Sequence, residues 1–273
     1  MLWLPFVLPG LGAYRMTDTL ESLMTPAVML GAFGPALAAV ILTARRGGWP
    51  AARSFLKDGI SLKAPFRFYA YALLLPTGVT AGAHFLANGL GVDDLPSTLL
   101  PSDLPIPTFL VLIPNLVLMF FLGGGQEEFG WRGYAQVPLQ RRLGFVPGSM
   151  VLGAIWGVWH LPLWFMPGED HAYYPFAAFM LYTISLSLVM GWLYEASGNK
   201  LIIPWLTHAM SNAVIPFFPI LHLEDARQPG YILWVTLNAL TAVIIASWYG
   251  RKRAVRIRRE TDLDLEPPSP PEA

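Results

Sequence analysis

The segment 174–194, YPFAAFMLYTISLSLVMGWLY, decides the fold class because it carries no charged residue. A helix that crosses the hydrocarbon core of a bilayer needs about 20 mostly apolar residues. Only 13% of the chain is charged, whereas a soluble domain carries about 25% charged residues. The composition therefore excludes an ordinary soluble enzyme and predicts an integral membrane protein whose surroundings are the lipid bilayer.

Other segments of similar length and character predict an all-α bundle of seven to eight transmembrane helices. They are about Pro26–Ala44, Phe66–Ala87, Ile106–Gly125, Ser149–Met166, Tyr174–Tyr194, Leu201–Leu221 and Tyr231–Tyr249. An eighth candidate, Leu2–Ala13, is short, lacks Lys or Arg before its apolar run and has no clear cleavage site. We interpret it as a shortened first helix, or as the rest of a helix preceding the assigned start codon, and not as a signal peptide.

Positive charge is distributed unevenly over the predicted loops. With seven spans and Arg251–Arg259 in the cytoplasm, only Arg15 and Arg227 of the 18 Lys and Arg fall outside. Because Lys and Arg that flank the spans stay in the cytoplasm, this bias predicts a cytoplasmic C-terminus, and we expect a prokaryotic plasma membrane. The 18 acidic residues balance the basic ones, so nucleic acid is not expected as a partner.

The chain shows no internal repeat and no second domain. We predict one transmembrane domain over residues 1–259, with its motifs in about 106–219. The segment 260–273 is acidic and rich in proline, cannot bury a core, and is predicted to be a disordered cytoplasmic tail.

Two adjacent glutamates, Glu127 and Glu128, lie between apolar flanks in GGGQEEFGWRGY, residues 123–134. An ionisable residue inside a membrane span costs about 2.5–3.5 kcal/mol, which makes it a candidate for function. Glu128 and Arg132 are four residues apart and share one helix face, whereas Glu127 points elsewhere. We expect Arg132 to neutralise Glu128 and to leave Glu127 free to take a proton. The alternative is an ion network that only holds helices together.

Two further spans carry polar residues at similar depth. His160 follows the sequence WGVW, and His208 and Asn212 share a helix face at four residues' spacing. A hydrogen-bonded packing role is the alternative for each. Glu127 with His160 can activate a water, and His208 with Asn212 can donate hydrogen bonds to an oxyanion. The chain has no cysteine, which excludes a cysteine nucleophile. It has no Gly-x-Ser-x-Gly, His-Glu-x-x-His or Gly-x-Gly-Asp motif, which excludes the serine hydrolases, zinc proteases and aspartyl intramembrane proteases that use these motifs.

The order Glu-Glu-x-x-x-Arg, aromatic-x-x-x-His and His-x-x-x-Asn on successive apolar segments resembles the CPBP or Abi family of intramembrane proteases. That family includes the CAAX prenyl endoprotease. The resemblance implies that Glu127 and His160 activate the water, that His208 and Asn212 form the oxyanion hole, and that Glu128 and Arg132 support them. The second motif departs from the usual Phe-x-x-x-His by having Trp156, a bulkier ring.

The sequence therefore predicts an endopeptidase that hydrolyses a peptide bond of a membrane-associated or lipidated substrate. The preferred interpretation needs no cofactor, although Glu127, His160 and His208 are also a ligand set that zinc accepts. A transporter or scaffold that uses the buried charges for a proton relay or helix pairing is the alternative function. A transporter would be expected to show inverted repeats and paired broken helices, and the sequence shows neither.

Overall fold

The computed structural model describes residues 3–101, 106–222 and 228–265, and for 254–265 it describes the backbone alone. These parts of the chain are helical and contain no strand. The longer helices are α2 (Asp18–Gly31), α3 (Gly34–Gly59), α4 (Phe66–Gly89), α5 (Thr108–Phe121), α8 (Phe145–Trp159), α9 (Phe176–Ala196), α10 (Ile202–Ala213) and α11 (Pro229–Leu265). The shorter ones are α1 (Leu4–Gly10), η1 (Gly125–Glu127), α6 (Glu128–Gly130), η2 (Trp131–Gln136), α7 (Val137–Leu143), η3 (Leu161–Phe165) and η4 (Asp170–Tyr173).

Six helical stretches are long and apolar enough to cross a membrane, and three of them start directly after a proline. Helices α4, α5 and α9 directly follow Pro65, Pro107 and Pro175. The amide groups at the start of a helix have no partner within the helix, so the missing amide hydrogen of proline removes no hydrogen bond there. The six stretches are Asp18–Gly59, Phe66–Gly89, Thr108–Leu143, Phe145–Phe165, Phe176–Ala196 and Pro229–Arg253. The all-α membrane bundle is thus confirmed, whereas the predicted count of seven to eight spans is not.

The difference lies mainly in the predicted span Leu201–Leu221. Its helix, α10, has only 12 residues and ends at Ala213, shortly before Pro216 and Pro219 in the sequence IPFFPI. Proline lacks the amide hydrogen that a helix interior needs, which explains the early end. Ten of the 12 residues are buried, because α10 packs against α4, α5 and α9. Burial among other helices therefore explains this segment as well as burial in lipid does. The eighth candidate forms only the seven-residue α1.

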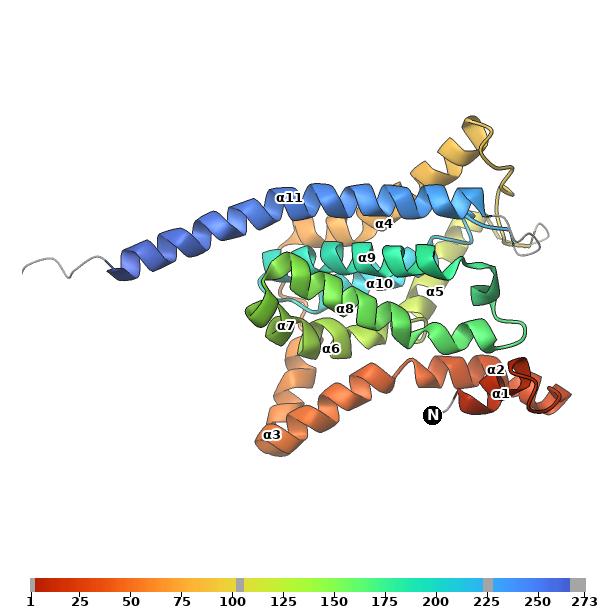
Figure 1. Ribbon diagram of the computed structural model, residues 1–273, viewed down its shortest axis with the longest axis horizontal. Coiled ribbons are helices and arrows are strands. Elements are labelled where there is room, and N and C mark those ends of the chain that lie inside the picture. The colour runs from red at the N-terminus through yellow and green to blue at the C-terminus, as the bar shows by residue number, and fades with distance from the viewer. Residues whose placement is uncertain (1–2, 102–105, 223–227, 266–273) are drawn as a thin grey trace, which may run out of the picture.

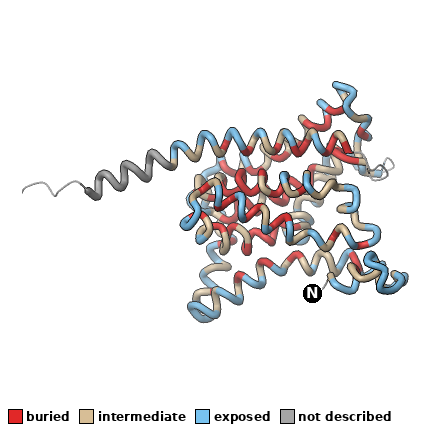
Figure 2. Tube along the Cα trace, viewed as in Figure 1, coloured by how far each residue is buried: buried red, intermediate tan, exposed pale blue. Residues whose placement is uncertain are grey.

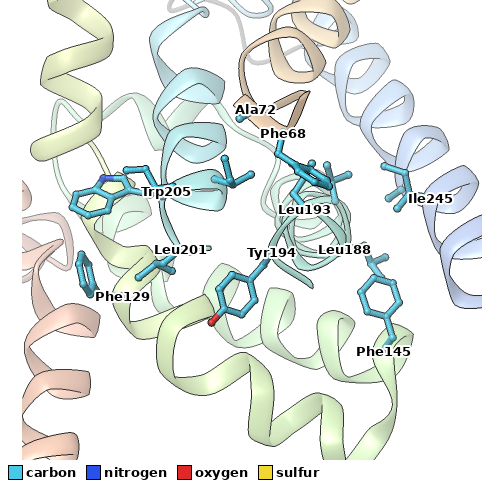
Figure 3. Packing of buried hydrophobic residues seen from close by; sticks show 14 residues of the cluster. Phe68, Ala72, Phe129, Phe145, Leu188, Leu193, Tyr194, Leu201, Trp205 and Ile245 are labelled. Atoms are coloured by element: carbon cyan, nitrogen blue, oxygen red, sulfur yellow. The ribbon is translucent and has the colours of Figure 1, made fainter. Parts of the chain in front are cut away.

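The helices pack around α9 and α10, with α2 and α3 at one side and α11 at the other (Figure 1). Burial follows this arrangement, since buried residues concentrate on α9 and α10 and exposed ones on the outer helices (Figure 2). The largest apolar cluster joins Leu193 of α9 and Trp205 of α10 with Phe68 of α4, Phe129 of α6 and Ile245 of α11 (Figure 3). This core fixes the segment around Phe129, next to the two glutamates, against α10.

Both α7 and the C-terminal half of α11 lie at one end of the bundle (Figure 1). Arg141 and Arg251 are exposed on these elements, as expected if one end carries the positive charge. The membrane side of that end remains a prediction. Helix α11 continues to Leu265, past the predicted domain boundary at residue 259. Residues 266–273 of the predicted tail lie outside the described residues, and the division into domain and tail remains a prediction.

Candidate active site

The link between α5 and α6 passes directly beside the third motif. Gly124 has φ +105°, a conformation that L side chains rarely adopt. A Cβ at this position would lie 2.8 Å from Nε2 of His208 and 3.4 Å from Nδ2 of Asn212. Glycine therefore lets the backbone approach both side chains. The chain then forms η1, α6 and η2. Helix η2 is a π-helix, a form that is rare overall but is often found at functional sites.

Glu127 is buried and is held by two indoles. Its Oε2 accepts hydrogen bonds from Nε1 of Trp131 at 3.1 Å and from Nε1 of Trp156 at 3.0 Å. The hydrogen bonds of the Glu127 side chain within the described residues are thus to Oε2, and Glu127 lines a cavity. Two donors on one oxygen fix the carboxylate and leave the second oxygen for a ligand in that cavity.

Glu128 joins the first motif to the third. Its Oε1 accepts from Nη1 of Arg132 at 2.8 Å and from Nδ1 of His208 at 2.9 Å. Glu128 and Arg132 are both 0% exposed, which confirms the pairing predicted from their spacing. A carboxylate only accepts hydrogen bonds, so the Nδ1 of His208 carries the hydrogen. Nε2 of His208 is then the atom that faces Gly124.

His160 and Asn212 are each anchored by a backbone carbonyl. His160 follows the last residue of α8, and its Nδ1 donates to the carbonyl oxygen of Trp156 at 2.8 Å. A neutral imidazole that donates from Nδ1 has a lone pair on Nε2. Asn212 donates from Nδ2 to the carbonyl oxygen of Gly123 at 2.8 Å and keeps a second amide hydrogen.

One cavity of about 510 Å³ collects the four residues predicted to be catalytic: Glu127, His160, His208 and Asn212. Helices α2, α5, α8, α9, α10 and α11 all contribute to its walls. Glu128 and Arg132 do not line it and lie behind His208. The structure thus brings together residues that are up to 85 positions apart, with the Glu128–Arg132 pair outside the cavity.

His171 lies in the loop after α8, is only partly exposed, and contacts the candidate site. The short helix η4 returns over the end of α8, and His171 stacks on His160 with ring centroids 6.1 Å apart. Glu169, Asp170 and His171 all line the cavity. Burial raises the pKa of Asp170, the charge of Glu169 adds to this, and His171 opposes it. No periodic spacing links His171 to the motifs, so this contact could not be predicted from the sequence.

The zinc ligands considered from the sequence, Glu127, His160 and His208, all line this cavity. In residues 3–101, 106–222 and 228–253 no three His, Cys, Asp or Glu side chains are grouped so that they could hold a metal ion. Glu127, His160 and His208 therefore share a cavity without forming the close set that zinc needs.

A family model described as "Type II CAAX prenyl endopeptidase Rce1-like" matches residues 109–214, which contain all three motifs and the cavity residues Glu127, His160, His208 and Asn212. This segment of the chain is similar to the Rce1-like family. The resemblance to CPBP proteins on which the sequence prediction rested is thereby confirmed.

The curated proteins that are similar to this chain carry two different names. "CAAX prenyl protease 2" of Methanococcus maripaludis is 29% identical over 107 residues, which cover 37% of this chain and 39% of that protein. "Lysostaphin resistance protein A" of Staphylococcus epidermidis is 31% identical over 192 residues, covering 70% of this chain and 45% of that protein. The protein of that name in Staphylococcus aureus is 27% identical over 196 residues, covering 71% and 42%. The matches span less than half the length of each relative.

Proposed function

We propose that this chain is an intramembrane endopeptidase that hydrolyses a peptide bond of a membrane-associated or lipidated substrate. One observation carries the proposal, namely that Glu127, His160, His208 and Asn212 line a single cavity inside the helix bundle. A proton acceptor beside groups that can donate hydrogen bonds is the arrangement that hydrolysis of an amide requires. The family match of residues 109–214 supports the same function.

In the proposed reaction, Oε1 of Glu127 takes a proton from a water molecule whose second hydrogen is accepted by Nε2 of His160. The water oxygen attacks the carbonyl carbon and forms a tetrahedral intermediate. When the carbon–nitrogen bond breaks, the protonated Glu127 returns the proton to the leaving nitrogen. The indoles on Oε2 favour this role, because they hold the carboxylate with its other oxygen towards the cavity.

The proposed oxyanion hole uses the second amide hydrogen of Asn212 and Nε2 of His208. Because Nδ1 of His208 donates to Glu128, Nε2 can donate only when the ring is an imidazolium. In that form the ring donates to Glu128 through Nδ1 and to the oxyanion through Nε2. The sequence assigned Glu128 a supporting role, and the structure supports a specific one, which is to orient this ring.

The walls of the cavity support a lipid-linked or membrane-associated substrate. Val28 and Met29 of α2 face the cavity together with Met119 and Leu122, at the end of α5. These apolar side chains suit an aliphatic chain or the apolar side chains of a peptide. The proposal requires no metal ion, because the water is activated by the carboxylate and the imidazole.

The test is cleavage of a fluorescence-quenched peptide by the purified protein in liposomes. A farnesylated peptide that ends in a CAAX sequence is compared with the same peptide joined to an unprenylated membrane anchor. We expect wild type to cleave at least one of them and Glu127→Gln to cleave neither. Glu195→Gln is the matched control, because Glu195 is a partly buried glutamate paired with Arg253, outside the cavity. Equal activity of Glu127→Gln and wild type, or no cleavage by wild type, would contradict the proposal.

A further inference from the structure

A line of buried polar side chains leads away from the candidate site along η2 and α7. Gln136 and Gln140 continue the four-residue spacing of Glu128 and Arg132, which places all four on one helix face. Glu128, Arg132 and Gln136 are 0% exposed, and Gln140 is 4% exposed. We call this line, together with the residues of α8 and α9 that face it, the polar seam.

Helices α8 and α9 meet the line with small residues at matching levels. At the outer level, Nε2 of Gln140 donates to Oγ of Ser149 at 2.9 Å. A Cβ at Gly191 would lie 3.0 Å from that Oγ and 3.4 Å from that Nε2. The seam therefore begins with α7, α8 and α9 in close contact.

The middle level lies one helical turn further inside the bundle. A Cβ at Gly153 would lie 2.9 Å from Cβ of Ser187, so α8 and α9 also touch here. Helices α7 and α8 run in opposite directions. One turn inward from Gln140 is therefore Gln136, and one turn inward from Ser149 on α8 is Gly153. Gln136 is thus at the level of Gly153 and Ser187.

The inner level ends at the ion pair behind the cavity. The guanidinium of Arg132 lies over the ring of Trp156, 4.9 Å from its centroid. A Cβ at Gly157 would lie 2.6 Å from Oγ1 of Thr183, one turn inward from Ser187 on α9. From Arg132 the seam continues through Glu128 to Nδ1 of His208.

Several buried atoms of the seam have no hydrogen-bond partner among the described residues. They are Oε1 and Nε2 of Gln136, Oγ of Ser187, Nε and Nη2 of Arg132, and Oε2 of Glu128. A buried polar atom without a partner costs about 1–3 kcal/mol. Both donors and acceptors are unpaired, and water is the small ligand that offers both and typically fills buried polar sites of this kind.

We propose that the polar seam binds a file of water molecules that links the α7–α8 end of the bundle with the Glu128–Arg132–His208 cluster. Gln136 and Ser187 hold the middle of the file, and Arg132 and Glu128 hold its inner end. The file gives this cluster a route for proton exchange that does not pass through the cavity.

Solid-state NMR of the uncleaved, substrate-free protein in liposomes tests the proposal independently of protease activity. The chain has four glutamines, Gln126, Gln136, Gln140 and Gln228, so each side-chain amide can be assigned by one Gln→Leu variant. We expect magnetisation transfer from water to the side-chain amide of Gln136 and to Nε of Arg132. Absence of this transfer at Gln136 in the wild-type protein would overturn the proposal.

The route is tested by the exchange of the Arg132 Nε proton with D₂O. We expect this exchange to be slower in Gln136→Leu, which replaces the amide by an apolar group of similar size, and in Ser187→Ala, the milder change. Ser185→Ala is the matched control on the same helix, because the Ser185 hydroxyl already donates to the carbonyl oxygen of Leu181 at 2.7 Å. Wild-type exchange in both Gln136→Leu and Ser187→Ala would overturn the route.

Discussion

The indole nitrogen of Trp156 donates a hydrogen bond to Oε2 of Glu127 at 3.0 Å and so joins the second motif to the first. The same ring lies edge-on to His208, with centroids 5.0 Å apart. The backbone carbonyl oxygen of Trp156 accepts a hydrogen bond from Nδ1 of His160. A phenylalanine, the usual residue of the related motif, would keep the ring contacts and the carbonyl but could not donate to Glu127.

We therefore expect Trp156→Phe to lower kcat about tenfold with little change in KM. A hydrogen bond to a charged group contributes roughly 1.5–3 kcal/mol, and about 1.4 kcal/mol corresponds to a factor of ten in rate. The measurement is steady-state cleavage by the two purified proteins. Trp205→Phe is the control, because Trp205 donates to the carbonyl oxygen of Phe120 and not to Glu127. Trp205→Phe is expected to lower thermal stability but not kcat, and an unchanged kcat in Trp156→Phe would contradict the role of the indole.

Contacts within one helix were accessible from the sequence. Helical geometry places Glu128 beside Arg132 whatever the rest of the fold does, and the ion pair is present. The four cavity residues were predicted as a group because polar side chains in apolar segments cost free energy, which indicates a function. Their roles in a reaction remain predictions.

Contacts between helices were not accessible in the same way. Two contacts depend on how α6, α8 and η4 pack. They are the hydrogen bond from Trp156 to Glu127 and the stacking of His171 on His160. The apolar composition of 201–221 also has two physical explanations, burial in lipid and burial in protein, and only the packed structure separates them.

Glu127 and His160 are expected to act on the same water molecule. Loss of either group should lower turnover by roughly 10²–10⁴-fold, the usual contribution of general acid–base catalysis. The double variant Glu127→Gln/His160→Ala should then be little slower than the slower single variant, because residues that act as a unit are not additive. Single-turnover rates of the three variants measure this. Effects that multiply would show that the two residues act independently.

Arg132 is expected to be required for folding as well as for activity. Removing it leaves the carboxylate of Glu128 fully buried beside His208 without its cationic partner. Breaking a buried pair in this way costs about 3–5 kcal/mol. Arg132→Ala should therefore melt at a lower temperature than wild type in the same detergent. If the variant were as stable as wild type and merely inactive, Arg132 would be reassigned to substrate binding.

The topology of the bundle predicts that Arg45, Arg141 and Arg251 lie on the same side of the membrane. The chain contains no cysteine, so one cysteine at each of these exposed positions would be its only thiol. An impermeant maleimide applied to right-side-out vesicles should leave all three unlabelled. It should label Asp94→Cys, in the loop after α4. Labelling of Arg141→Cys together with Asp94→Cys would contradict the topology.

A strong chelator is expected to leave cleavage unchanged. In the described parts of the chain, the candidate ligands Glu127, His160 and His208 share a cavity but do not form a close three-ligand group. The proposed reaction uses the carboxylate of Glu127 as the proton acceptor, so its rate should not depend on metal content. The measurement is the cleavage rate before and after dialysis against the chelator, with metal content determined on the same samples. Loss of activity on chelation, with recovery on adding Zn²⁺, would replace the glutamate-activated water by a metal-bound one.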